Sequence, residues 1–150
     1  MNFTIENIAK SLAAHLADTL TDTTFYEDAN QQDTDLPCAF LQQTYARIDN
    51  RVGRRYLRHI GLDLTYLVDY NLPNMQQLYN AAAEKLDEVM ELFDYTDGTD
   101  TAKLHTYDRN WTIDNDALHY KFELRVWCEV EEKFVPMATM DYDERIKDDG

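Results

Sequence analysis

The sequence predicts an α+β fold with two helices packed on one face of a largely antiparallel (mixed) sheet, a long hairpin and an extended C-terminal arm. Two segments have apolar residues at three- and four-residue steps, which is typical of amphipathic helices. Several others alternate apolar and polar residues, which is typical of strands with one buried face. The chain length of 150 residues suits one domain, which we expect at residues 1–130, followed by the arm at residues 131–150.

The first predicted helix covers residues 4–19. One apolar stripe runs along it, formed by Ile5, Ile8, Leu12 and Leu16. Thr4 has a side chain suited to the N-cap, and Phe3 is placed to pack onto Ile8 as a hydrophobic staple. A short strand is predicted next, at residues 25–26.

Two longer strands are predicted to form a hairpin with a long basic tip. The first runs from Leu36 to about Tyr45, and Pro37 suits its start because proline is tolerated at the first residue of a strand. The second is indicated by period-two alternation over residues 60–68, with one buried face. Between them five of the 14 bases fall within twelve residues, opposed by Asp49 alone. These bases are Arg47, Arg51, Arg54, Arg55 and Arg58.

A second helix is predicted from Met75 to about Tyr95, after the break at Pro73. Its apolar stripe is formed by Met75, Leu78, Ala82, Leu86, Val89 and Phe93. One strand or a strand pair is expected over residues 103–107 and 111–113.

The clearest strand signal lies at residues 118–130. Its apolar face is formed by Leu118, Tyr120, Phe122, Leu124, Val126, Cys128 and Val130. At about 3.3 Å per residue this strand would be roughly 40 Å long, so it could extend past its own sheet and reach a neighbouring subunit. Residues 134–150 have no periodicity, and we expect an arm that becomes ordered on assembly.

The charge balance argues against some classes of partner. The chain has 29 acids and 14 bases, a formal charge of −15, and such a surface repels nucleic acid and anionic membranes. No targeting segment and no apolar run of the ~18 residues that a membrane span needs is visible, so we expect a cytoplasmic protein during assembly and no membrane partner. Cys38 and Cys128 match no metal spacing, and we interpret both as small buried hydrophobes in a reducing compartment.

No constellation for catalysis stands out, so we predict no enzyme, no cofactor and no metal site. The four glycines form no phosphate-binding loop, and neither His-Glu-x-x-His nor Cys-x-x-Cys occurs. His59 and His119 lie on the polar sides of strands, where solvated or hydrogen-bonded histidines are expected. The acids around Gly98 have the wrong spacing for a calcium loop, and we interpret them as a turn.

Several motifs follow one another in an order that is informative about family. They are Phe25-Tyr26, Gln31-Gln32, Leu36-Pro37-Cys38-Ala39-Phe40, Arg54-Arg55-Tyr56 and Asp116-Ala117-Leu118-His119-Tyr120-Lys121-Phe122. Together with the two helices, this order resembles the tail-terminator (tail-completion) proteins of phages and prophages of Gram-positive bacteria, over about residues 5–130. The loop at residues 28–35 is more polar and acidic than that family's pattern, so we expect its tip to meet a different partner.

The resemblance implies a structural virion protein of the tail or neck. Such a protein would form a homo-oligomeric ring, usually a hexamer, that caps the tail tube protein and offers a joining surface to the head–tail connector and neck proteins. DNA would pass through the lumen without specific binding, because acidic groups repel its phosphates.

Subunit-interface candidates come from the basic hairpin, the last strand and the arm. They are Arg47, Arg51, Arg54, Arg55, Arg58, Trp127, Phe134, Met137, Met140 and Tyr142. The arginines allow three interpretations: a salt-bridge socket for an acidic neighbouring subunit, a phosphate or DNA site, or a solvated loop. Other functions also stay open: a different neck or head–tail connector component, an acidic DNA mimic that inhibits a nuclease, or a small enzyme.

Overall fold

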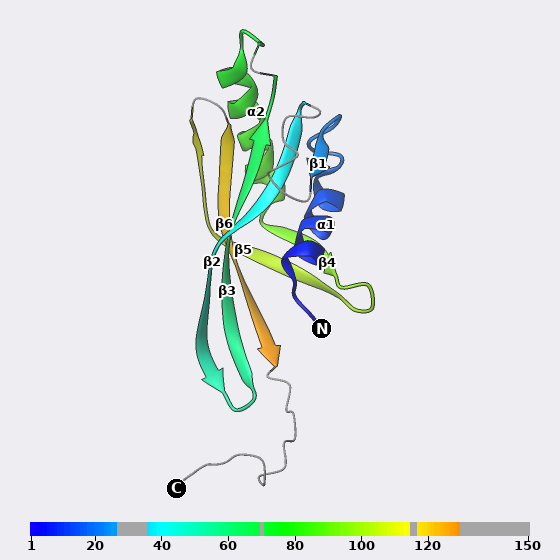
Figure 1. The fold of residues 1–150 in the computed structure, drawn as a ribbon, viewed down its shortest axis with the longest axis vertical. Coiled ribbons are helices and arrows are strands. Elements are labelled where there is room, and N and C mark those ends of the chain that lie inside the picture. Colours follow the sequence, from blue (N-terminus) through cyan, green and yellow to red (C-terminus); the bar gives the residue numbers. More distant parts are fainter. Residues whose placement is uncertain (27–35, 70, 115–116, 130–150) are drawn as a thin grey trace, which may run out of the picture.

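The structure, a computed structural model, describes residues 1–26, 36–69, 71–114 and 117–129, and only the backbone of residues 50 and 51 (Figure 1). This part of the chain folds into α1 (Ile5–Leu16), β1 (Thr24–Tyr26), β2 (Cys38–Val52), β3 (Arg55–Leu67), α2 (Met75–Val89), β4 (Leu92–Thr96), β5 (Thr101–Ile113) and β6 (Leu118–Glu129). The predicted α+β class is therefore confirmed. The predicted arm at residues 131–150 lies outside the described residues.

The strands form one mixed sheet in the order β1-β2-β3-β6-β5-β4. β1 runs parallel to β2, and the other neighbouring pairs are antiparallel. β3 and β6 pair along almost their whole length, from Arg55 opposite Glu129 to Tyr66 opposite Leu118. With β2 they form a three-stranded ribbon that continues past both helices (Figure 1).

Both helices contribute to one hydrophobic core over the same side of the central strands. From α1 and α2 the core takes Ile8, Leu12, Leu16, Tyr79, Ala82, Ala83 and Leu86. From β3 and β6 it takes Ile60, Leu62, Leu64, Leu118, Tyr120, Phe122, Leu124 and Val126. The helical and period-two patterns single out most of these residues. Tyr79 and Ala83 lie outside the predicted stripe of α2, and Ile5 of the predicted α1 stripe is 40% exposed.

α1 begins where the sequence predicts. The Thr4 side chain accepts a hydrogen bond from the Asn7 backbone N–H at 3.2 Å, which satisfies one of the unpaired donors of the first turn. The Phe3 ring packs against Tyr95, with ring centroids 5.0 Å apart.

The hairpin between β2 and β3 is present, but its long basic tip is not. β2 continues to Val52 and β3 begins at Arg55, so Gly53 and Arg54 alone form the turn. Gly53 has a φ of 61°, a left-handed conformation that glycine adopts without a side-chain penalty. Two-residue turns of this kind match the twist of paired strands, which lets the strands extend to the tip. Arg47 therefore lies in a strand rather than in a loop.

The second helix is shorter than predicted. α2 ends at Val89, and Leu92–Thr96 is strand β4, which the sequence analysis missed. Phe93 and Tyr95 are both buried, as expected for period two in a strand. The prediction was wrong because Phe93 also fits the helical stripe that ends at Val89, so the two periods overlap there.

Residues 101–113 form the single strand β5, with a register shift between Tyr107 and Asn110. The acidic turn before it links β4 to β5. There Asp97 accepts hydrogen bonds from the backbone N–H groups of Thr99 and Asp100 at 2.9 and 2.8 Å, as expected for a turn.

Neither cysteine forms a disulfide, and the two lie at opposite ends of the ribbon. Cys38 is opposite Leu67 and is buried, whereas Cys128 is opposite Tyr56 and is half-buried. Among the described residues, no helix has the length and apolar character required to cross a bilayer.

Candidate assembly surface

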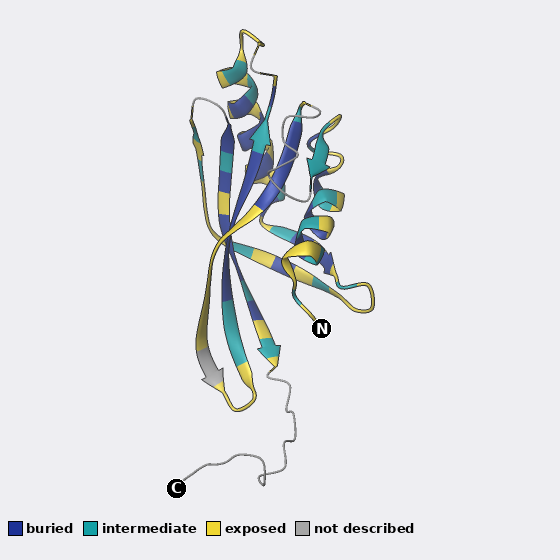
Figure 2. Ribbon diagram, viewed as in Figure 1, coloured by how far each residue is buried: buried dark blue, intermediate teal, exposed yellow. Residues whose placement is uncertain are grey.

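The ribbon of β2, β3 and β6 ends in a projection, comprising residues 46–52, 55–58 and 127–129 with the turn between β2 and β3. From here on, the arm means this projection and not the predicted C-terminal arm at residues 131–150. The arm extends beyond the helices, and much of its surface is exposed (Figure 2). Three large apolar side chains on it face solvent: Val52 is 67% exposed, Ile48 62% and Trp127 44%. Exposed apolar side chains gathered on one projecting element are typical of a protein–protein contact.

A change of register places different residues of β2 on the two faces of the ribbon. Before the shift, Leu41 lies opposite Leu64 on the core side. After it, Tyr45 lies opposite Gly61 on the outer side, so Tyr45, Arg47 and Asp49 point away from the helices. Ile48 is paired with Arg58 and lies on the inner face, whereas Val52 is paired with Arg55 and lies on the outer face.

The predicted arginine cluster is divided between these faces. On the outer face, the Arg55 guanidinium lies 4.8 Å from the centre of the Trp127 ring, a cation–π contact. On the inner face, Arg58 donates a hydrogen bond to the Phe3 backbone carbonyl, which ties the ribbon to the start of α1. These two arginines therefore have structural partners within the subunit.

The remaining predicted arginines have different surroundings. Arg47 lies on the outer face, with its Nε 3.7 Å from Asp49, and Arg54 is in the turn. Arg51 belongs to β2, but its side chain is outside the described residues. The predicted candidates Phe134, Met137, Met140 and Tyr142 also lie outside the described residues.

A buried polar cluster lies under Tyr45 on the outer face. The Tyr45 hydroxyl donates to Glu123, which is only 4% exposed. The same carboxylate accepts a bond from Arg125 Nε at 2.6 Å and lies 2.9 Å from His59 Nδ1. The one-sided burial predicted for residues 60–68 is therefore wrong, because the polar face of β3 is also covered here.

The donors around Glu123 control its ionisation. Burial alone would raise the pKa of this carboxyl, but the hydrogen bonds that it accepts outweigh burial and lower its pKa to about 2. Arg125 also lies 3.3 Å from Asp108 and 4.2 Å from the centre of the Tyr107 ring. The cluster thus links β2, β3, β5 and β6 and fixes the ribbon just before it becomes the arm.

His119 joins the strands at the other end of this face. Its Nδ1 lies 3.0 Å from Asp63 and its Nε2 lies 2.9 Å from Asp114. His59 and His119 therefore both contact carboxylates, as predicted for polar strand positions. No group of three or more potential metal ligands occurs among the described residues.

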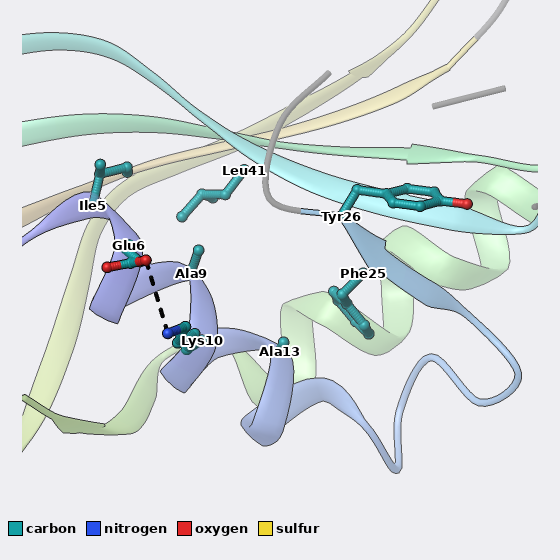
Figure 3. Close-up of a pocket in the computed structure, with 8 residues that line it drawn as sticks. All are labelled: Ile5, Glu6, Ala9, Lys10, Ala13, Phe25, Tyr26 and Leu41. Carbon is teal, nitrogen blue, oxygen red and sulfur yellow. Dashed lines mark ion pairs between the residues drawn. The ribbon is translucent and has the colours of Figure 1, made fainter. Parts of the chain in front are cut away.

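A groove runs between α1 and the sheet edge formed by β1 and β2 (Figure 3). Its volume is about 410 Å³, and it is lined by Ile5, Glu6, Ala9, Lys10, Ala13, Phe25, Tyr26 and Leu41. Glu6 and Lys10 form a surface ion pair along one wall, with Nζ and Oε2 3.8 Å apart. The rest of the lining is apolar or aromatic, so the groove suits an apolar side chain.

Sequence reasoning singled out the arm but missed the groove and the cluster under Tyr45. The alanines at positions 9 and 13, four residues apart in α1, were a usable signal, because small side chains on one helix face leave space beside it. Glycine at position 61 inside a strong strand pattern was another, since glycine in a strand often marks a close approach by another group.

The comparisons with known proteins identify one family. A family model described as phage tail terminator protein matches residues 7–136. The matched region includes α2, all the described strands and all but the first two residues of α1. Comparison with curated proteins gives no match.

Proposed function

The chain belongs to the phage tail terminator family, a family of structural tail proteins, and from this premise we propose that it caps the tail tube as a ring and forms the joining surface to the head. We expect a hexamer, assembled in the host cytoplasm and retained in the virion at the tail–neck junction. In this proposal the protein has no enzymatic role.

The observation that most strongly supports a ring is the exposed apolar surface of the arm. A three-stranded ribbon with Val52, Ile48 and Trp127 exposed is poorly suited to end in solvent, because burying apolar surface lowers the free energy by about 25 cal/mol per Å². Its contacts to other strands fix its direction relative to the core. A rigid, apolar projection of this kind supports contact with a second subunit.

The charge supports a role beside moving DNA. Six copies at −15 each would carry about −90, so a bore lined by part of this charge would repel the phosphates of passing DNA. The same repulsion would keep unassembled subunits soluble.

A tube-capping assay tests the proposal. Tail tubes polymerised from the cognate tube protein are mixed with the purified chain, and fresh tube protein is added afterwards. We expect negative-stain electron microscopy to show a ring at one tube end and no further elongation from that end.

Two other results would point to the alternative functions. Continued elongation of the tubes, together with binding to connector proteins alone, would identify the chain as another neck component. Inhibition of a nuclease by the isolated chain would support the acidic DNA mimic. Tubes mixed with a small globular protein of similar charge give the baseline elongation rate.

A further inference from the structure

We propose that the end of the arm of one subunit docks in the groove between α1 and β1 of the next copy in the ring. This inference rests on the proposed ring and names the contact that builds it. The occupant is a second copy of this chain, and the leading side chain is Val52.

The groove has the size and lining for such an occupant. Its volume of about 410 Å³ lies within the range of about 300–1,000 Å³ that is typical of ligand-binding clefts, so it has room for a side chain. Phe25 and Tyr26 form one wall, and Ala9 and Ala13 leave the opposite wall low. Aromatic walls beside small residues offer apolar area to an inserted aliphatic side chain.

The arm presents matching groups but cannot reach the groove of its own subunit. Val52 and Ile48 are its most exposed large apolar side chains, at 67% and 62%. The arm projects away from α1 and β1, and strand pairing holds that direction (Figure 1). An arm that occupies the groove must therefore come from another copy.

Charge complementarity favours the same pairing. The arm with its turn holds five bases and two acids, Asp49 and Glu129, which leaves 27 of the 29 acids and nine of the 14 bases in the rest of the chain. A basic arm is therefore attracted to the acidic remainder of a neighbouring subunit.

The contact has the symmetry that a ring needs. The arm and the groove are different surfaces of one subunit, so their contact is head-to-tail rather than self-complementary. Head-to-tail contacts close into a ring when the rotation between neighbours allows it. Each subunit then donates one arm and accepts one.

Thiol crosslinking on capped tubes tests the contact directly. In a Cys128→Ser background, the double variant Val52→Cys with Ala13→Cys is treated with a short bis-maleimide. We expect a ladder of covalent oligomers that extends to the full ring. The matched pair Val52→Cys with Thr99→Cys, where Thr99 is exposed in the β4–β5 turn, should give no species beyond a dimer.

Substitutions provide a second test of the contact. We expect Val52→Asp and Ala13→Arg each to lower ring formation at least ten-fold by mass photometry and electron microscopy. The controls are Leu72→Asp, a 41% exposed apolar side chain away from the arm, and Ala14→Arg, the exposed helix neighbour of Ala13. Both controls should form rings, and all four variants should keep the circular dichroism spectrum of the native chain.

The outcomes separate this inference from the proposed function. Rings that cap tubes without a Val52–Ala13 ladder would overturn the docking and leave the capping role intact. Crosslinking of Ala13→Cys to the tube protein would assign the groove to that partner and also overturn the docking. Failure of the native chain to form any ring on tubes would overturn both.

Discussion

The Tyr45 ring lies directly over Gly61, so closely that a Cβ on residue 61 would be 2.0 Å from Tyr45 Cε1. The two residues are cross-strand partners on the outer face of the ribbon. Glycine therefore makes room for the ring, and the ring in turn covers the Glu123 carboxylate, to which its hydroxyl donates. The aromatic–glycine pair sets the geometry at the base of the arm.

We predict that Gly61→Ala destabilises the protein by about 1–3 kcal/mol, because the added methyl group forces the Tyr45 ring off Glu123. Urea denaturation followed by circular dichroism measures this change in the free energy of unfolding. In a Tyr45→Ala background the same substitution should be neutral or stabilising by about 0.4–1 kcal/mol, since alanine restricts the unfolded chain. Equal losses in both backgrounds would contradict the steric explanation.

We predict that acid weakens the fold through Glu123. Its pKa of about 2 lies below the ordinary value of 4.5, so the folded state binds fewer protons than the unfolded state between these values. The resulting stabilisation is fully present above about pH 4.5 and is lost as the pH falls towards 2. The loss should be of the order of 3 kcal/mol, at about 1.4 kcal/mol per pKa unit.

The control for this prediction is the Glu123→Gln variant, which cannot ionise. The free energy of unfolding of both proteins is measured by urea titration from pH 7 to pH 2. Asp97 also has a pKa lowered to about 2, by hydrogen bonds from the backbone N–H groups of Asp100, Asn2 and Thr99, so Asp97→Asn is measured in parallel. If Glu123→Gln kept the full pH dependence of the native protein, other carboxylates would be responsible.

Much of the fold can be predicted from the sequence because its apolar residues recur at regular helical or strand spacing. The stripe of α1 and the alternation of β6 predict their buried faces correctly, since both depend on local spacing alone. The end of α2 could not be predicted in the same way. Phe93 satisfies both a helical and a strand period, and pairing with Leu104 of β5, a partner from beyond the turn, places it in a strand.

The candidate surface is less predictable, because it depends on register between strands. The sequence shows five arginines close together, but the pairing places Arg55 against Trp127 and Arg58 against the Phe3 carbonyl on the opposite face. The groove depends on the approach of α1 to β1, a tertiary distance that no local pattern encodes. Exposure of Val52 likewise follows from a short turn that extends the strands.

We predict that Asp87→Ala destabilises the protein by about 1 kcal/mol, because Asp87 holds α2 against the sheet. Its carboxylate accepts hydrogen bonds from the Tyr120 hydroxyl at 2.7 Å and from Trp111 Nε1 at 3.3 Å. The matched control is Glu88→Ala, since both acids are exposed in the last turn of the same helix. Removing a negative charge near a helix C-terminus is by itself stabilising, by about 0.3–1 kcal/mol. The midpoint temperature of thermal unfolding should therefore fall for Asp87→Ala and rise for Glu88→Ala. A rise for both variants would mean that these hydrogen bonds contribute little.

We predict that the protein binds duplex DNA more weakly than a typical non-specific DNA-binding protein, whose Kd at physiological salt is about 10⁻⁴–10⁻⁶ M. A net charge of −15 repels phosphates, and Arg55 and Arg58 already have partners within the subunit. Fluorescence anisotropy with a labelled duplex at low salt measures the affinity where attraction would be strongest. Binding that weakens as salt is added, and that Arg54→Glu abolishes, would instead make the arm a phosphate site. Because the docking proposed for the arm needs the same bases to face an acidic neighbour, that result would also show that DNA competes with the subunit contact.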